Sequence, residues 1–255
     1  MLFDELDKKM RKYEQSLDQV LLPELFIAAR LDGRGFTRLT KEICQFEAPF
    51  DVRFRDMMIH TVKSLMDCGF RIVYGYTESD EISLLFAPDD NTFGRKVRKI
   101  NSTLAGEASA AFSLELGKRA TFDCRVIPLP TVESVVDYFR WRQEDAHRNS
   151  LNAHCYWMLR KEGVSELAAT QKLEGKSISF KNELLFSRGI NYDKLPAWQK
   201  RGIGLWKETY VKEGYDPIRK VAVPAVRNRL TVCEELPLGE EYAKLIRGFL
   251  EKQEQ

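Results

Sequence analysis

The sequence is poor in the residues that build disulfides, zinc sites and membrane spans. Its five cysteines are scattered, odd in number and without a CxxC pair, and it has only three histidines. These counts favour reduced thiols in a cytoplasm and argue against disulfides, a zinc site or a histidine cluster. No apolar run approaches a membrane-spanning length, and residues 1–15 lack the apolar core of a secretory signal. The sequence therefore predicts a cytoplasmic protein that does not bind membranes.

The sequence also lacks an excess of one charge. Its 40 basic residues nearly balance 38 acidic ones, which leaves a formal net charge of +2. A chain this close to neutrality has no global positive field, so any contact with nucleic acid must come from local basic patches. With 255 residues, 44% of them hydrophobic, the chain is long enough for one sizeable core.

What the sequence does contain is a regular succession of helix and strand patterns before residue 130. Turn residues and apolar periodicity predict helices at 3–18, 51–68 and 93–116, and strands at 25–31, 71–74, 82–86 and 122–129. From the first strand on, the order is β-α-β-β-α-β, the split arrangement of ferredoxin-like domains. The predicted fold class is thus α+β, with an antiparallel sheet in a domain spanning residues 1–130.

The character of the chain changes after Pro130. Residues 131–173 look mostly helical, 176–230 mix short strand-like pieces with Gly and Pro, and 239–252 are typical of a final helix. No Ser/Gly-rich linker separates the two halves. We therefore expect residues 131–255 to pack on the first domain as a helical and short-strand region.

Three carboxylates, Glu78, Asp80 and Glu81, lie between the strands predicted at 71–74 and 82–86. In the predicted sheet the first and third strands are antiparallel neighbours, so Asp32 in RLDGRGF should lie close to Asp80. Two carboxylates that close require a cation, and hard oxygen ligands favour Mg²⁺. The Gly33 carbonyl could approach the same ion, and a second Mg²⁺ would complete a site for phosphoryl transfer. The alternative is a solvated turn; in a catalytic site Glu81 would be a third ligand or a supporting residue, and Glu78 would be exposed.

Two further stretches are rich in polar groups. Arg95, Lys96 and Lys99 lie near a predicted helix N-terminus, where the macrodipole disfavours cations. They form either a solvated helix face or a clamp for a triphosphate. The stretch WRQEDAHRNSLN at 141–152 either reads RNA by stacking and hydrogen bonding or forms a subunit interface.

Several segments together resemble one protein family. RLDGRGF, YTESDEISLLF, FDCRV, DYFRWRQEDAHRNSLNAHCYW, FKNELLF and GINYDKLP follow one another over about residues 10–232. In this order they resemble the tRNA-histidine guanylyltransferase family, in its bacterial and archaeal guanylyltransferase-like branch. The resemblance implies a polymerase-palm-like catalytic domain, a homotetramer, and addition of nucleotides to the 5′ end of tRNA, opposite in direction to ordinary polymerases. It also implies two Mg²⁺ ions, ATP or GTP as the activating nucleotide, and nucleoside triphosphates as substrates.

The resemblance assigns roles to individual positions. Asp32, the Gly33 carbonyl and Asp80 match the metal ligands, and Asp32, Asp80 and Glu81 are the catalytic carboxylates it implies. The positions expected to bind nucleotide are Arg34, Gly35, Phe36, Ser79, Arg95, Lys96, Lys99 and Arg125. Those expected to bind RNA are Arg142, His147, Asn149, Lys181 and Asn182.

The sequence departs from the family pattern at two places. Ala48 in APFD stands where eukaryotic members have the lysine of a KPND-like stretch, which removes one triphosphate contact. HRNSLNA at 147–153 replaces their HINNLYN, which argues against strict dedication to histidine tRNA and favours templated repair of 5′-truncated tRNAs. Two other functions remain open: a palm-type nucleotide cyclase, which would explain the carboxylates but not residues 138–192, and a non-catalytic tRNA-binding chaperone.

Overall fold

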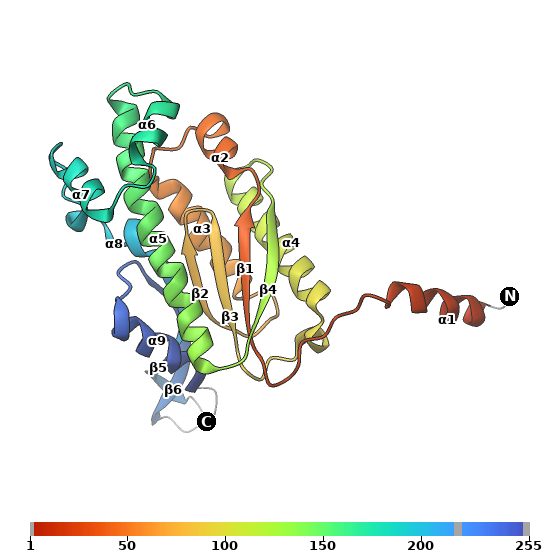
Figure 1. Cartoon of the computed structure of the whole chain (residues 1–255). Helices are drawn as coiled ribbons and strands as arrows, with labels where there is room; N and C mark the ends of the chain where they lie inside the picture. Colours follow the sequence, from red (N-terminus) through yellow and green to blue (C-terminus); the bar gives the residue numbers. More distant parts are fainter. Residues whose placement is uncertain (1–2, 217–220, 252–255) are drawn as a thin grey trace.

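The chain folds around a six-stranded antiparallel sheet (Figure 1). A computed structural model describes residues 3–216 and 221–251. The strands are β1 (Phe26–Gly33), β2 (Ile72–Glu78), β3 (Glu81–Phe86), β4 (Phe122–Leu129), β5 (Ile203–Asp216) and β6 (Val221–Cys233). Their order across the sheet is β4-β1-β3-β2-β5-β6, and every adjacent pair is antiparallel.

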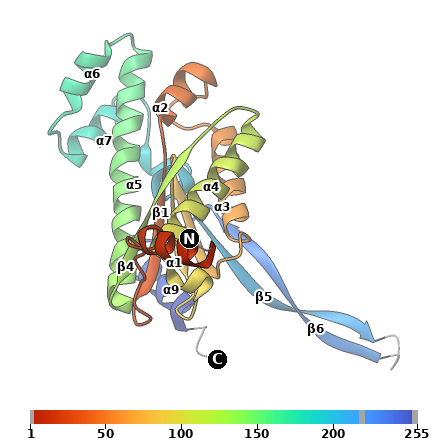
Figure 2. The same ribbon diagram turned by 90° about the vertical axis from the view of Figure 1, so that its right-hand side faces the viewer.

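Helices cover both faces of this sheet. Helices α3 (Val52–Leu65) and α4 (Val97–Leu116) lie on one face, and α5 (Val132–Lys161) and α9 (Gly239–Glu251) lie on the other (Figure 2). Helix α1 (Phe3–Glu14) has no buried residue and extends away from the sheet (Figure 1). None of the helices in the described ranges is both long enough and apolar enough to cross a membrane. The shorter elements are α2 (Phe36–Arg38), η1 (Leu39–Ile43), η2 (Thr92–Arg95), α6 (Glu166–Leu173), α7 (Ile178–Phe186), η3 (Tyr192–Lys194) and α8 (Ala197–Arg201).

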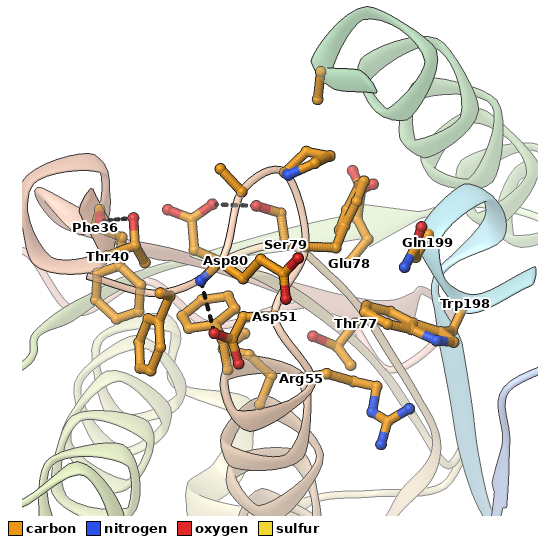
Figure 3. Close-up of a pocket in the computed structure, with 18 of the residues that line it drawn as sticks. Phe36, Thr40, Asp51, Arg55, Thr77, Glu78, Ser79, Asp80, Trp198 and Gln199 are labelled. Carbon is orange, nitrogen blue, oxygen red and sulfur yellow. Dashed lines mark hydrogen bonds between the residues drawn. The ribbon is translucent and has the colours of Figure 1, made fainter. Parts of the chain in front are cut away.

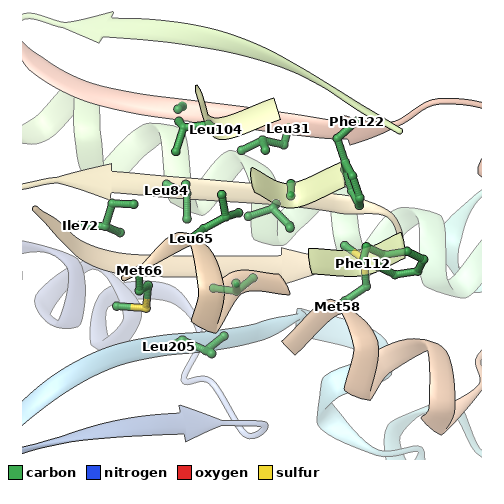
Figure 4. Packing of buried hydrophobic residues seen from close by; sticks show 14 of the residues in the cluster. Leu31, Met58, Leu65, Met66, Ile72, Leu84, Leu104, Phe112, Phe122 and Leu205 are labelled. Atoms are coloured by element: carbon green, nitrogen blue, oxygen red, sulfur yellow. The ribbon is translucent and has the colours of Figure 1, made fainter. Parts of the chain in front are cut away.

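Alternating side chains of β1 contribute to two layers of the core. Ile27, Ala29 and Leu31 are buried in the cluster formed with α3 and α4 (Figure 4). Ala28 belongs to the second cluster, beneath α5 and α9. Because successive side chains of a strand point to opposite faces, Asp32 shares the face of Ala28. The end of β1 therefore presents a carboxylate on the side covered by α5.

Helix boundaries follow the local sequence signals. The Asp51 side chain accepts a hydrogen bond from the Arg53 N–H at the start of α3, and Thr131 does the same for Ser134 at the start of α5. Gly117, with a φ of 68°, ends α4 in the left-handed conformation that glycine adopts without strain.

The β-α-β-β-α-β order predicted for the first half is confirmed, and the strand at 122–129 has the predicted bounds. The helix predicted at 93–116 begins only at Val97, because the backbone at Phe93 and Gly94 has positive φ values of 54° and 60°. The first helix ends at Glu14 rather than at position 18. The mostly helical prediction for 131–173 and the final helix are confirmed, although position 252 lies outside the described residues.

Strands do occur within 176–230, as predicted, but they are long and not short. Helices α7 and α8 occupy the first part, and β5 and β6 then form a long hairpin that continues the sheet, with Leu205 opposite Gly75 of β2. Figure 2 shows this hairpin extending beyond the helical layers. A strand that leaves the core is not required to alternate apolar and polar residues, so its sequence carries little strand pattern.

Candidate active site

The candidate site lies where β1 ends and β3 begins. Asp32 is opposite Glu81 in the ladder, and the Gly33 N–H donates to the Asp80 carbonyl oxygen over 3.1 Å. The antiparallel register continues into β2 and β4, so that carboxylates recur at matching positions of neighbouring strands. Four of them form a row across the sheet: Glu78, Glu81, Asp32 and Asp123.

Among the described residues, no basic side chain forms an ion pair with either of the two aspartates predicted as metal ligands. Within the described part of the chain, the ion pairs of Arg30 and Arg142 go to other carboxylates of the site, and none reaches Asp32 or Asp80. Burial, and then the negative charge of Asp32, raises the pKa of the Asp80 carboxyl. The Ser79 hydroxyl donates a hydrogen bond to Asp80 Oδ1 over 3.3 Å. A cation between the two aspartates would relieve their repulsion.

The donors at this position fit a magnesium site. Asp32, Asp80 and the Gly33 carbonyl offer oxygen atoms, and Mg²⁺ typically binds one or two carboxylates and completes its shell with water and substrate phosphates. Among the described residues no group of three or more His, Cys, Asp or Glu side chains is arranged as metal ligands. Glycine is needed at position 33, since a Cβ there would lie 2.5 Å from the Phe36 ring.

Glu81 is held by an arginine of α5. Arg142 donates to both oxygens of Glu81, at 2.6 Å from Nε and 2.7 Å from Nη2, and its Nη2 also lies 3.1 Å from Asp145. Arg142 is only 4% exposed, so its guanidinium has no free edge for RNA. The expectation of an RNA contact at Arg142 does not fit this placement. The two hydrogen bonds from Arg142 favour the supporting role predicted for Glu81 over that of a third metal ligand.

Glu78 was expected to be exposed, and this is wrong. Its side chain is only 13% exposed and lies 3.7 Å from Arg142. Burial, followed by the negative charge of Glu81, raises the pKa of Glu78 to about 8. The pairing of Glu78 with Glu81 across a covered sheet explains this, because both side chains point toward α5.

The basic run lies at the opposite end of the sheet. The Arg95 guanidinium is buried and donates to the backbone carbonyls of Pro23 and Leu25, just before β1 begins. Lys96 is ion-paired with Asp18, and Lys99 lies 5.7 Å from the Phe93 ring. The seven residue steps of β1 span roughly 23 Å at the usual strand rise. The three residues of the predicted clamp therefore cannot reach a triphosphate at Asp32 of the same chain.

The other positions expected to bind nucleotide divide into two groups. Arg34 and Gly35 are exposed in the turn after Asp32, and Arg125 is exposed on β4 beside Asp123, at 3.9 Å. Phe36 is instead 2% exposed and packs against the Phe112 and Phe122 rings, so it shapes the site from below.

A cavity of about 270 Å³ opens beside the turn that carries Asp80 (Figure 3). Its walls come from the β2–β3 turn, from α2 and η1, from residues 46–51, and from α3, α5 and α8. Carboxylates of Asp80 and Glu78 and the rings of Phe36 and Trp198 face it (Figure 3). Aromatic walls with a few charged groups are typical of small-molecule sites, and this volume suits a nucleoside-sized group.

The positions expected to bind RNA are dispersed along α5 and α7. Asn149 donates to Asp145 over 3.2 Å. The centre of the His147 ring lies 5.4 Å from that of Tyr192. Burial, together with the charges of Lys200 and Arg201, lowers the pKa of His147. The backbone carbonyl of Lys181 accepts a hydrogen bond from the Cys155 thiol. Cys155 is thirteen residues after Arg142 in α5, which corresponds to about 20 Å along the helix. Lys181 and Asn182 are partly exposed there, distant from Asp32.

Three residues of the site were missed by the sequence. Arg30 lies 3.9 Å from Glu81, and its position two residues before Asp32 on a strand could have revealed that they share a face. Lys41 and Trp157 line the cavity from η1 and α5. They have no local signal, because only the tertiary fold brings them to the β2–β3 turn.

Comparison with known proteins supports one family over nearly the whole chain. The family described as tRNAHis guanylyltransferase matches residues 7–130, and the Thg1 C terminal domain matches residues 133–232. The tRNA(His) guanylyltransferase of Schizosaccharomyces pombe is 31% identical over 253 residues, which cover 95% of each chain. That of Debaryomyces hansenii is 35% identical over 213 residues, or 78% of this chain and 80% of the relative.

Solved structures share the fold. A bacterial tRNA(His) guanylyltransferase (Thg1)-like protein in complex with ATP matches with a TM-score of 0.73 and 27% identity, over 96% of this chain and 99% of that one. The same kind of protein in complex with GTP matches with a TM-score of 0.72 and 28% identity, over 96% and 98%. The protein is therefore a nucleotidyltransferase. It belongs to the tRNA(His) guanylyltransferase family, and the similarity to bacterial Thg1-like structures agrees with the predicted branch.

Proposed function

We propose that this protein adds nucleotides in the 3′–5′ direction to the 5′ end of tRNA and repairs 5′-truncated tRNAs with the opposite strand as template. The observation that carries the proposal is the pair Asp32 and Asp80: no described basic side chain forms an ion pair with either, and Asp80 lines a nucleoside-sized cavity. The relatives are tRNA(His) guanylyltransferases, and the bacterial Thg1-like structures bind ATP and GTP.

The reaction proceeds in two substitutions at phosphorus. An oxygen of the RNA 5′-monophosphate attacks the α-phosphorus of ATP or GTP and releases pyrophosphate. The 3′-hydroxyl of an incoming nucleoside triphosphate then attacks the activated 5′-phosphorus and releases the nucleoside monophosphate. Each substitution needs an in-line nucleophile and neutralisation of the negative charge on the non-bridging phosphate oxygens. RNA that already carries a 5′-triphosphate skips the first substitution.

The carboxylate pair fixes where this chemistry occurs. Asp32, Asp80 and the Gly33 carbonyl would hold two Mg²⁺ ions, which when bound lower the pKa of the attacking hydroxyl and stabilise the leaving group. Glu81, fixed by Arg142, keeps the row of carboxylates in place. The exposed Arg34 and Arg125 border the same end of the sheet and are available to the phosphates of the incoming nucleotide.

The nucleoside of the activating nucleotide occupies the cavity, with its ring against Trp198. Residues 1–130 form the catalytic domain, and residues 131–255 contribute RNA-binding and subunit contacts. A cytoplasmic homotetramer would cover the apolar face of α1, where Phe3, Leu6, Met10 and Tyr13 are 46–78% exposed. The altered HRNSLNA stretch supports a repair substrate over strict dedication to histidine tRNA.

A comparison of substrates tests the proposal. The protein is incubated with Mg²⁺ and each nucleoside triphosphate, alone or with full-length or 5′-truncated tRNA. Template-dependent lengthening of the truncated tRNA is expected. A cyclic nucleotide formed without RNA would identify a cyclase, and tRNA binding without any lengthening would identify a non-catalytic chaperone; either result contradicts the proposal.

A further inference from the structure

Lys41 brings to the cavity beside Asp80 a positive charge that no described carboxylate neutralises. It lies in η1, a π-helical turn in which the Cys44 N–H donates to the Leu39 carbonyl over 2.9 Å. Single π-helical turns are frequent at functional sites. Because η1 follows the Asp32 turn and α2 directly, the same short segment carries a predicted metal ligand and this lysine.

The lining of the cavity contains more acidic than basic groups. Glu47, Asp51, Glu78 and Asp80 line it, whereas Lys41 and Arg55 are the cationic residues of the lining among those that the structure describes. Ala48, also in the wall, contributes no charge. A polyanionic ligand would therefore depend on one or both of these cations, together with any bound metal.

Arg55 is already engaged. Its Nη1 lies 3.1 Å from Glu234 and its Nη2 lies 2.8 Å from Asp56. Its guanidinium carbon is also 5.1 Å from the centre of the Trp198 ring. An arginine held by two carboxylates and a ring is oriented by the protein and has little charge left for a ligand.

Lys41 is different. Its side chain is exposed, and it forms no ion pair with any residue in the described ranges. The ammonium lies 5.0 Å from the centre of the Trp157 ring and 6.0 Å from that of Tyr156. At an exposed site an aromatic ring attracts an ammonium less strongly than a phosphate does through charge-assisted hydrogen bonds. The ammonium can therefore exchange the ring for an anion at the mouth of the cavity.

We propose that Lys41 binds the phosphates of the nucleotide held in this cavity. The inference rests on the proposed function, because that function supplies a nucleoside triphosphate as the ligand. The nucleoside packs against the aromatic walls, and the phosphates extend between the Lys41 ammonium and the Asp32–Asp80 pair. Lys41 thereby sets affinity for the phosphates, whereas the rings set affinity for the nucleoside.

Titration calorimetry of the full chain with Mg²⁺-ATP and with adenosine separates these contributions. Lys41→Ala is expected to weaken ATP binding about tenfold or more, while adenosine binding changes less than about twofold. Lys41→Arg, which keeps the charge, retains ATP binding within about threefold. Lys172→Ala, an exposed lysine of α6 outside the cavity, is the matched control and leaves both affinities unchanged.

The possible outcomes distinguish this inference from the proposed function. Unchanged ATP affinity in Lys41→Ala, with the wild type binding ATP, overturns the role of Lys41 alone. An equal loss for ATP and adenosine also overturns it, since Lys41 would then shape the cavity. If Lys41→Ala loses binding to 5′-truncated tRNA but keeps its affinity for ATP, the Lys41 ammonium contacts RNA and not the nucleotide, and the inference is overturned. A wild type that binds no ATP contradicts the proposed function and this inference together.

Discussion

Asp80 and Glu81 are consecutive residues, yet the structure gives them different surroundings. Glu81 accepts two hydrogen bonds from Arg142, whereas Asp80 has only the Ser79 hydroxyl as a side-chain partner among the described residues. Glu81 points from the strand toward α5, and Asp80 sits in the turn beside Asp32. The sequence alone predicts the cluster of acids but not this division, because Arg142 lies 61 positions away from Glu81.

The buried ion pair between Arg142 and Glu81 should make a large contribution to the free energy of unfolding. Arg142→Ala leaves Glu81 buried without its partner, and we expect the free energy of unfolding to fall by about 3 kcal/mol. Urea unfolding measures this. Arg148→Ala, an exposed arginine of the same helix, is the control and should change the value by less than about 0.5 kcal/mol. Equal effects of the two substitutions would show that Arg142 does not hold the row of carboxylates.

Glu78 predicts a pH dependence of stability. Its pKa is raised from 4.5 to about 8, so the folded state binds this proton more tightly than the unfolded chain does. The stabilisation is complete below the unfolded pKa and is lost as the pH rises toward 8. Without Mg²⁺, Glu78→Gln should reduce the fall in unfolding free energy between about pH 5 and pH 8.5 by roughly 4 kcal/mol.

Denaturant unfolding at a series of pH values checks this prediction. The exposed Glu235→Gln serves as the control, because it removes a carboxylate that the fold does not bury. A pH profile of Glu78→Gln that runs parallel to that of the wild type would mean that Glu78 titrates like a solvated side chain.

At the scale of elements, the approach of α3 to the sheet depends on a glycine. A Cβ on Gly75 of β2 would lie 2.5 Å from Val62 Cγ1, and Val62 is fully buried in α3. Gly75→Ala is expected to lower the free energy of unfolding by about 1–3 kcal/mol through overpacking. Combined with Val62→Ala, which makes room, it should cost less than the sum of the two single changes.

Thermal unfolding of the four variants in this cycle gives the coupling. Gly106→Ala is the control, since a Cβ at that position of α4 meets no atom within 4 Å, and alanine there should stabilise the helix by about 0.5–1 kcal/mol. Additive effects of Gly75→Ala and Val62→Ala would contradict the close packing of β2 and α3.

The elements that the sequence predicts well are those that face the core. The strand at 122–129 and the helix that becomes α3 have regular apolar spacing because one side of each is buried. The hairpin of β5 and β6 lacks that spacing. Its exposed part is held by backbone pairing and by cross-strand contacts such as Glu208 with Arg229, at 2.9 Å, which leave no apolar period in the sequence.

At the scale of the whole molecule, topology decides which predicted site residues meet. The antiparallel neighbours β1 and β3 bring Asp32 to Asp80, which the β-α-β-β-α-β order allowed us to predict. The same topology excludes Arg95 from the site. Strand β3 starts beside the carboxylates and runs to the opposite end of the sheet, and Arg95 lies at that opposite end, where it contacts the Leu25 carbonyl. The cavity depends on contacts between η1, α5 and α8, which no local pattern encodes.

The most direct test of the central claim compares the wild type with Asp32→Asn and Asp80→Asn in the lengthening of 5′-truncated tRNA with Mg²⁺. Removing either charge should reduce the rate by about 1,000-fold or more, because the remaining donors no longer hold the metal ions. Binding of the same tRNA, measured by filter retention, should change less than about threefold. Lengthening at close to the wild-type rate by either variant would contradict the account, since the carboxylate pair would then not be the catalytic centre.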